Sequence, residues 1–351
     1  MTMKNNPASL GYRMPAEWEP QSGIWLAWPH NPDTWPGKNL ADIESVYIDI
    51  AQALCNEETV HILVNDFAGR DKAKMLLAER KLSSEQIKLH IIAHNDSWIR
   101  DYGPNFIIRE FEGQKQLAFN NWGFNSWGGK YPWNLDNKVN DHIASALSID
   151  QFKPGIVLEG GAIEVNGQGL CLTTGSCLLN ESRNGKVTQE AMERYLQDHL
   201  GISKTIWLEG GFLDGDDTDG HIDNLARFVS PSTVVCVVEE NPADPNYEGL
   251  AKNRKTLEQA TDLEGNPLTV IPLPMPDPVM DQGIRLPASY ANFYIGNRTV
   301  LLPAYGGEKD KLVEKLLRPL FPNREIVPIH STDLIAGLGG IHCISQQMPS
   351  T

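Results

Sequence analysis

The hydrophobic positions of this chain fall into short, β-branched runs separated by longer amphipathic stretches. The short runs are typical of strands, and they are predicted at Gly23–Trp28, Val60–Val64, Ile87–Ile92, Phe106–Ile108, Ile163–Val165, Leu170–Thr173, Thr233–Val238, Leu268–Ile271 and Val300–Leu302. The longer stretches are predicted as helices at Asp42–Leu54, Lys72–Arg80, Lys186–Leu200, Tyr247–Leu263 and Lys309–Leu320. Because the two kinds of segment alternate to the end of the chain, the sequence predicts an α/β fold.

The pattern gives no clear domain boundary. The best candidate is the proline cluster Pro272–Pro278, but it is short and is predicted to be a surface loop. The chain has 351 residues, of which 41% are hydrophobic, so it can bury a sizeable core. Residues 1–351 are therefore predicted to form a single domain.

A four-residue segment recurs along the chain. Leu158–Gly161 reads Leu-Glu-Gly-Gly, Leu208–Gly211 repeats it, and Leu338–Gly340 repeats it in part. These echoes indicate repeated units of ~50–70 residues, each with a glycine-rich strand end in an equivalent position. A ring of small α/β units would make such an echo natural, whereas a single doubly wound sheet would not require it.

The net charge narrows the choice of partner. The chain carries 30 Lys and Arg against 45 Asp and Glu, a formal charge of −15. This acidity argues against nucleic acid, which is bound largely through basic side chains. It is compatible with a cationic substrate drawn toward an acidic opening, although many proteins are acidic for solubility alone.

The cysteines and the apolar runs bear on location. The five cysteines are unclustered and odd in number and form no Cys-x-x-Cys pair, so neither a disulfide framework nor a structural zinc site is expected. No run approaches the ~20 apolar residues of a membrane helix. The segment Met1–Leu10 is polar and does not resemble a signal peptide. A cytoplasmic location without membrane contact is therefore predicted.

The most unusual segment is Asp214–Asn224, which contains five Asp and one His. A calcium loop starting at Asp214 fails, because its sixth position is Asp219 rather than Gly and its twelfth is Leu225 rather than Glu. A transition-metal site could use His221 and Asp223, predicted on one side of a strand, but would need further ligands. Acid–base chemistry at His221 is the third alternative. A solvated acidic turn is the default, but the segment runs directly into an apolar stretch.

Two further segments carry candidate chemistry. Asn95–Pro104 contains Trp98 and Asp101, and on a strand Asp101 would face inward with Trp98. A carboxylate beside an indole suits a planar cation, although an Arg–Asp surface pair is the simpler alternative. Gly337–Gln347 places glycines before Cys343. A lone cysteine is usually a small buried hydrophobe. Covalent catalysis needs a cysteine, a histidine from elsewhere and carboxylates, and the three segments supply that set. His342 is expected on the opposite side of a strand from Cys343, in a supporting role.

The three segments resemble the signature segments of the agmatine deiminase and bacterial peptidyl-arginine deiminase family. The resemblance extends to Met14–Pro20, Trp25–Pro29, Phe124–Gly129 and Leu158–Gly161. This family belongs to the guanidine-modifying pentein superfamily, so the resemblance implies a five-bladed α/β propeller with pseudo-fivefold symmetry. Such a ring would account for the echoed Glu-Gly-Gly.

The resemblance also implies roles for individual residues. By motif, the nucleophile falls on Cys343, the general acid and base on His221, the guanidinium-binding carboxylates on Asp101 and Asp223, a glutamate near the histidine on Glu159, a carboxylate for the distal ammonium on Asp217, and a channel wall on Trp98. Trp28–Lys38 departs from the longer, Arg-containing stretch of agmatine deiminases, which leaves the amine substrate open.

The sequence therefore predicts hydrolytic deimination of a small guanidinium compound through a cysteine thiouronium intermediate. The expected reaction converts agmatine and water to N-carbamoylputrescine and ammonia, with no metal and no organic cofactor. Peptidyl-arginine or free arginine is the alternative substrate. A metal-dependent hydrolase using His221 and Asp223 is the alternative mechanism, and a catalytically silent binding module is a third class. The resemblance also implies a homodimer as a possible assembly.

Overall fold

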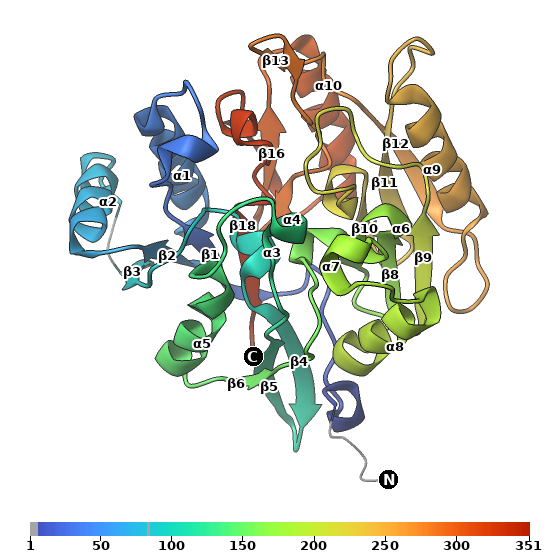
Figure 1. Ribbon diagram of the computed structural model, residues 1–351, viewed down its shortest axis with the longest axis horizontal. Helices are drawn as coiled ribbons and strands as arrows, with labels where there is room; N and C mark the ends of the chain where they lie inside the picture. The colour runs from blue at the N-terminus through green and yellow to red at the C-terminus, as the bar shows by residue number, and fades with distance from the viewer. Residues whose placement is uncertain (1–5, 83–84) are drawn as a thin grey trace.

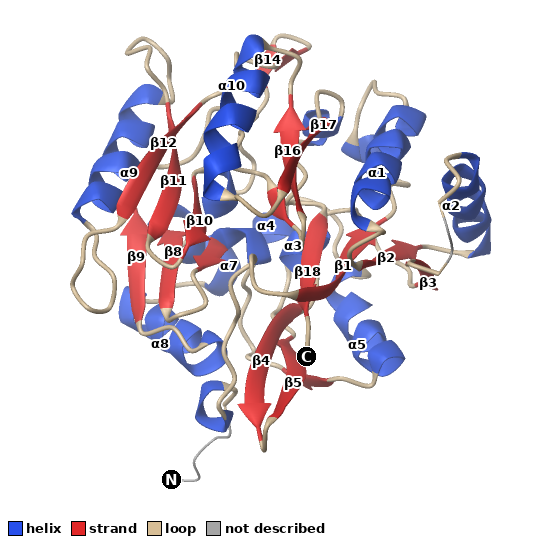
Figure 2. Cartoon of the chain, turned by 180° about the vertical axis from the view of Figure 1, so that it is seen from behind, coloured by secondary structure: helices blue, strands red, loops and turns tan. Residues whose placement is uncertain are grey.

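The computed structural model describes residues 6–82 and 85–351 (Figure 1). Part of the predicted polar segment Met1–Leu10 therefore lies outside the described residues. The longer helices are α1 (Leu40–Leu54), α2 (Phe67–Glu79), α5 (Asp136–Leu147), α8 (Gln189–Leu200), α9 (Tyr247–Gln259) and α10 (Glu308–Leu317), and the shorter ones are α3 (Ile99–Tyr102), α4 (Ser126–Gly129), α6 (Gly175–Leu178) and α7 (Glu181–Asn184). Figures 1 and 2 place the longer helices toward the outside and most strands further in.

The described strands form small sheets rather than one large sheet. Their orders are β18-β1-β2-β3, β4-β5-β6, β7-β8-β9, β10-β11-β12 and β15-β16-β17, with β13-β14 as a separate hairpin. Their bounds are β1 Gln21–Ala27, β2 Thr59–Val64, β3 Ile87–Ile91, β4 Asn105–Phe111, β5 Gln114–Asn120, β6 Asp150–Phe152, β7 Ile163–Val165, β8 Leu170–Thr174, β9 Lys204–Leu208, β10 Ala226–Ser230, β11 Thr233–Val238, β12 Thr269–Pro274, β13 Met280–Asp281, β14 Ile284–Arg285, β15 Tyr294–Ile295, β16 Thr299–Ala304, β17 Glu325–His330 and β18 Ser345–Pro349.

The larger sheets repeat one pairing pattern. In each, the first two strands are antiparallel and the next pair is parallel. A parallel pair needs a crossover, and here a long helix supplies it, as α5 does between β5 and β6 and α9 does between β11 and β12. The same hairpin–helix–strand unit therefore recurs along the chain.

The two ends of the chain meet in one sheet. C-terminal β18 pairs antiparallel with N-terminal β1, so that Ile24 lies opposite Gln347, and Figure 2 shows β18, β1 and β2 side by side. This pairing fixes the turn that precedes β18. Cys343 lies in that turn, so its position depends on contacts between the first and the last strand.

The predicted α/β class is confirmed, and each strand predicted from an apolar run overlaps a strand of the structure. The prediction for Pro272–Pro278 is wrong: it is not simply a surface loop, because its first residues belong to β12. β12 pairs only with β11. An edge strand tolerates Pro272 and Pro274 because their missing N–H groups face away from the ladder.

Several elements escaped the sequence pattern. They include β9, β10, β17, β18 and α5. β18 reads Ser-Gln-Gln-Met-Pro and looks like a loop, yet most of it is buried in the structure. Among the described helices, none has both the length and the apolar content that crossing a membrane requires.

Candidate active site

A cavity of about 640 Å³ lies where α3, the loop after α4 and the turn before β18 meet. Cys343, Asp101 and Trp98, three of the candidate site residues, line it. Further carboxylates line it as well, namely Asp33, Asp96, Asp217 and Asp281. Such a lining attracts a cation.

Cys343 is 5% exposed and lies in the turn before β18. Two neighbouring glycines let other groups come close to this turn. A Cβ on Gly339 would lie 2.3 Å from the Trp98 ring, so only glycine allows Trp98 to pack here. The Cys343 Sγ lies 3.9 Å from Asp223 Oδ2. Burial, followed by the charges of Asp223 and Asp101, raises the pKa of the Cys343 thiol well above its usual range. In the site without ligand, this thiol is therefore neutral.

Asp101 lies on the short helix α3 and not on the strand that the sequence suggested. The turn forms because Trp98 begins the helix and the following Gly-Pro pair ends it. The backbone N–H of Gly161 donates to Asp101 Oδ1 at 2.9 Å, and Trp127 Nε1 donates to Oδ2 at 3.0 Å. Burial raises the pKa of Asp101, with Asp223 adding to the rise and His221 opposing it. Both oxygens are thus anchored at the cavity wall.

His221 immediately precedes the short 3-10 helix η4 (Ile222–Asn224), and Asp223 lies within it, so the predicted strand is wrong here too. His221 Nδ1 lies 3.6 Å from Asp101 Oδ1, and Nε2 lies 3.8 Å from Glu159 Oε2. Burial alone would lower the pKa of His221, but Asp101, Cys177 and Glu159 raise it well above its ordinary value. The imidazole is therefore charged at neutral pH.

Asp223 is fully buried and only half satisfied. Its Oδ2 accepts from His342 Nδ1 at 2.8 Å, whereas Oδ1 has no hydrogen-bond partner. Burial works against the charge, but the His342 contact lowers the pKa of Asp223 below its usual range. An ionised, buried oxygen without a donor is costly. Asp223 Oδ1 is therefore free to accept a hydrogen bond.

His342 lies in the turn before β18, not on a strand. Its Nε2 makes a 2.8 Å hydrogen bond with Glu17 Oε2, while Nδ1 holds Asp223. Both ring nitrogens of His342 are therefore occupied by carboxylates, and one of them fixes Asp223.

Glu159 lies just before the short 3-10 helix η3 (Gly160–Ala162) and is fully buried. Arg183 Nε donates to its Oε1 at 2.9 Å, and Cys177 Sγ lies 3.5 Å from Oε2. Although burial raises its pKa, His221 and Arg183 lower it overall. Glu159 is thus an ionised partner on the side of His221 opposite Asp101.

Glu159, Cys177 and His221 could together hold a metal ion. Their ligand atoms all lie within 4.8 Å of one another. One contact weighs against that use, because one oxygen of Glu159 already binds Arg183. The predicted pairing of His221 with Asp223 as metal ligands does not occur in this group.

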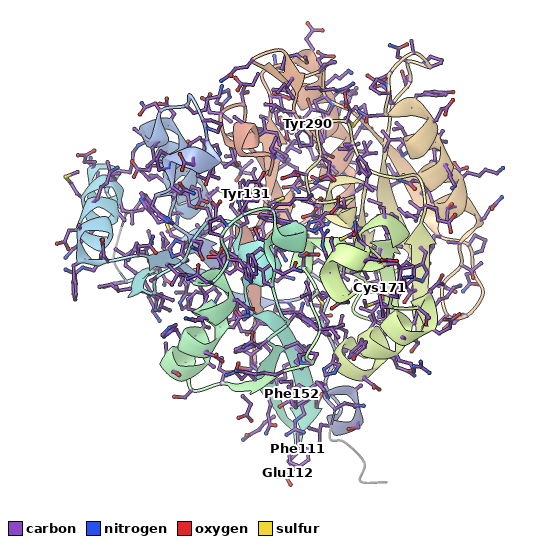
Figure 3. All side chains as sticks on the ribbon, in the orientation of Figure 1. Phe111, Glu112, Tyr131, Phe152, Cys171 and Tyr290 are labelled. Atoms are coloured by element: carbon purple, nitrogen blue, oxygen red, sulfur yellow. The ribbon has the colours of Figure 1, made fainter. Side chains whose placement is uncertain are left out.

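Asp217 lies at the cavity, as expected, but it has partners there. Lys130 Nζ lies 3.1 Å from its Oδ1, and the hydroxyl of Tyr131 (labelled in Figure 3) donates to Oδ2 at 2.7 Å. The distal ammonium of an amine substrate would therefore either share the Asp217 carboxylate with Lys130 or displace Lys130 from it.

Several residues that contact the site were not predicted from the sequence to have a role in it. They are Glu17, Trp127, Cys177, Arg183 and Asn292. Glu17 and Trp127 belong to segments on which the family resemblance rests. Their places in those motifs could therefore have marked them as site residues. Asn292 is a polar residue inside the apolar run Ala291–Ile295, and this pattern is a weaker indication of a site residue.

A buried ionic cluster contacts His342 and, through it, orients Asp223. Arg227 is fully buried and pairs with Glu164 at 2.8 Å and with Glu17 at 3.0 Å. Glu17 in turn holds His342, and His342 holds Asp223. The orientation of the Asp223 carboxylate thus depends on a chain of buried charges.

Replacing Arg227 with methionine is expected to lower the free energy of unfolding by roughly 3–5 kcal/mol, because it leaves the buried Glu164 without its cation and removes one of the cations beside Glu17. The exposed pair Arg254–Glu258 on α9 is the matched control, since both side chains are nearly half exposed. Arg254→Met should change stability by no more than about 0.5 kcal/mol. Denaturant titration measures both. Equal losses in the two variants would contradict the role given to the cluster.

Comparison with known proteins identifies relatives over nearly the whole chain. Residues 13–349 match the model of the Porphyromonas-type peptidyl-arginine deiminase family. An agmatine deiminase of Stutzerimonas stutzeri is 34% identical, with 99% of this chain and 98% of the relative covered. One of Medicago truncatula is also 34% identical, and both chains are covered completely. The structure of the agmatine deiminase of Enterococcus faecalis matches with a TM-score of 0.90 and 32% identity, covering 99% of this chain and 98% of the other.

Proposed function

This chain belongs to the Porphyromonas-type peptidyl-arginine deiminase family, and on that premise we propose that it hydrolyses agmatine to N-carbamoylputrescine and ammonia. The single observation that carries the proposal is the convergence of Cys343, His221, Asp101 and Asp223 on one point. All four side chains are buried. A Cβ on Gly161 would lie within 3.1 Å of His221, Asp101 and Asp223, so these three surround one point. Cys343 joins them through Asp223, whose Oδ2 lies 3.9 Å from its sulfur.

The two aspartates are proposed to bind the guanidinium. Asp223 Oδ1 lacks a donor, and Asp101 is anchored at the cavity wall. A guanidinium carries five N–H groups in a plane and can meet carboxylates on two edges. This places its central carbon beside the Cys343 Sγ, which lies 3.9 Å from Asp223.

Binding of the cation is also proposed to activate the nucleophile. The charges of Asp223 and Asp101 oppose ionisation of Cys343, since both raise its pKa. A bound guanidinium neutralises that field, so the thiol releases its proton to solvent as the substrate binds. The thiolate is therefore favoured more strongly in the occupied site than in the empty one.

The chemistry proceeds in two halves. The thiolate adds to the guanidinium carbon, and the protonated His221 transfers its proton to the departing nitrogen, which leaves as ammonia. A cationic thiouronium remains on Cys343. Water then adds to the same carbon while His221 takes one of its two protons. Collapse of the tetrahedral adduct breaks the carbon–sulfur bond, and the remaining hydroxyl proton passes to the departing sulfur. The products are a ureido compound and the neutral Cys343 thiol, and His221 is again protonated.

Glu159 is proposed to act through His221. It is ionised and buried, and it lies on the Nε2 side of the ring. Its charge favours the imidazolium needed in the first half of the reaction. Arg183 fixes its orientation from the far side.

The cavity favours agmatine over arginine. No Lys or Arg is among the described residues that line it, whereas several carboxylates are. Two nearby lysines, Lys130 and Lys38, are already paired with the lining carboxylates of Asp217 and Asp281. The carboxylate of free arginine would have to compete for them, whereas the distal ammonium of agmatine would meet acidic groups. We propose Asp217 as one of these partners and Trp98 as a wall of the channel.

Product analysis tests the function directly. Purified protein is incubated in parallel with agmatine, free arginine and an arginine peptide blocked at both ends. We expect ammonia and N-carbamoylputrescine from agmatine, with much slower release from the other two. Faster release of ammonia from the blocked peptide would assign the alternative substrate, and no release from any of the three would refute the deiminase.

Several broader properties are proposals as well. The five repeated hairpin–helix–strand sheets, together with closure of β18 on β1, support a five-bladed arrangement within a single domain over residues 1–351. The five free cysteines support work in a reducing cytoplasm. The chemistry proposed here uses side chains alone and requires neither a metal nor a cofactor. A homodimer and the lack of nucleic-acid binding stay predictions.

A further inference from the structure

Asn292 touches the proposed nucleophile but has no part in the scheme above. It lies two residues before β15 and is 1% exposed. Its Nδ2 lies 3.2 Å from Cys343 Sγ and donates to Asn224 Oδ1 at 2.9 Å. Both hydrogens of the amide group are thus assigned, one to the sulfur and one to a neighbouring side chain.

The orientation of this amide follows from its surroundings. The backbone N–H of His342 donates to Asn292 Oδ1 at 2.9 Å. The backbone N–H of Cys343 also donates to this oxygen, at 3.4 Å. Because a backbone N–H can only donate, these two groups favour the oxygen on their side and leave the nitrogen for the Cys343 sulfur. A Cβ on Gly340 would lie 2.5 Å from Asn292 Oδ1. Only glycine at position 340 therefore leaves room for this arrangement.

We propose that Asn292 is a catalytic residue that donates a hydrogen bond to the Cys343 thiolate and stabilises it before attack and again when it leaves. This inference rests on the proposed function, in which Cys343 is the nucleophile. A hydrogen bond from an amide to an ionised sulfur is stronger than one to a neutral thiol. The neutral thiol can instead donate to Asn292 Oδ1, 3.5 Å away, so the same amide serves both protonation states.

An uncharged donor suits this site for an electrostatic reason. The Cys343 sulfur lies beside carboxylates that oppose its ionisation, so the thiolate needs a donor from the protein. A lysine or arginine at this position would supply one, but its charge would repel the cationic guanidinium that must approach the same sulfur. A buried amide stabilises the thiolate without that repulsion. In agreement, the Asn292 hydrogen bond opposes the rise in the pKa of Cys343.

The test follows alkylation of Cys343 by iodoacetamide as a function of pH, with labelling at this residue quantified by mass spectrometry. Asn292→Ala removes the donor. Asn292→Asp keeps an oxygen for the His342 N–H but replaces the donor with a carboxylate oxygen. In both variants we expect alkylation below the thiolate midpoint to slow by roughly 10- to 100-fold, with the midpoint moved to higher pH by about 1 to 2 units.

Asn253 supplies the matched control. It is also 1% exposed and also accepts a backbone N–H through Oδ1, from Gly210 at 2.7 Å, but it lies away from Cys343. Asn253→Ala should keep the wild-type pH profile. If Asn292→Asp alkylates like wild type, or if Asn253→Ala moves the midpoint equally, the assignment is wrong.

Alkylation does not depend on turnover, so this result stands apart from the reaction itself. A shifted midpoint in a protein that releases no ammonia from any guanidinium would refute the proposed function and keep the assignment. An unshifted midpoint in an enzyme that releases ammonia would refute the role of Asn292 and leave the proposed function standing.

Discussion

Replacing Cys343 with alanine is expected to lower the rate of ammonia release from agmatine by roughly 10⁴-fold or more, the scale seen when a covalent nucleophile is removed. Its Sγ is the only thiol at the cavity among the described residues, and the other carboxylates and His221 cannot form the thiouronium bond. The fold should persist, because alanine keeps the Cβ and removes a side-chain atom that borders an open cavity.

The control for this variant is Cys236→Ala. Cys236 is fully buried in β11, and its sulfur contacts only the backbone oxygen of Val237 among the described hydrogen bonds. That variant should lose some stability and keep its activity. Near-full activity in Cys343→Ala would end the covalent scheme. A binding assay with agmatine separates lost chemistry from lost affinity, since Asp101 and Asp223 remain in the variant.

The class of fold could be predicted from the sequence because it is a local property. Runs such as Thr233–Val238 are apolar and β-branched, and the helices between them show an amphipathic pattern. β18 could not be predicted in this way. Its Gln346 and Gln347 are polar but buried, and Arg100 donates to Gln347 from α3. Such a strand is stabilised by partners distant in sequence, which no local pattern contains.

The proposed site shows the same division. Its chemistry could be predicted because Cys343, His221 and the carboxylates are the residue types that covalent hydrolysis needs. Their local geometry could not. Asp101 and Asp223 were predicted on strands but lie in short helical turns, where φ and ψ are set by the groups they meet rather than by periodicity. The charge on His221 likewise arises only when the chain folds and brings Asp101 and Glu159 to either side of it.

Replacing His221 with alanine is expected to lower the rate of ammonia release by roughly 10³-fold or more, because one side chain supplies the acid of the first half-reaction and the base of the second. Its raised pKa means that the acid form persists above the range of a free imidazole. Wild-type activity should therefore extend to alkaline pH and fall as His221 loses its proton.

His61→Ala is the matched control, since His61 is also buried but stacks on Trp25 in the sheet of β1 and β2. It should lose stability and keep its pH profile. Wild-type protein treated with a chelator completes the design, because the removal of a metal ligand would also inactivate His221→Ala. Activity lost to the chelator and restored by a divalent cation would favour the metal-dependent hydrolase. Activity that is unaffected by the chelator but lost in His221→Ala would leave proton transfer as the role of the imidazole. Asp101 and Glu159 cannot replace it as proton donors, because each already accepts a hydrogen bond from another partner, Gly161 and Arg183 respectively.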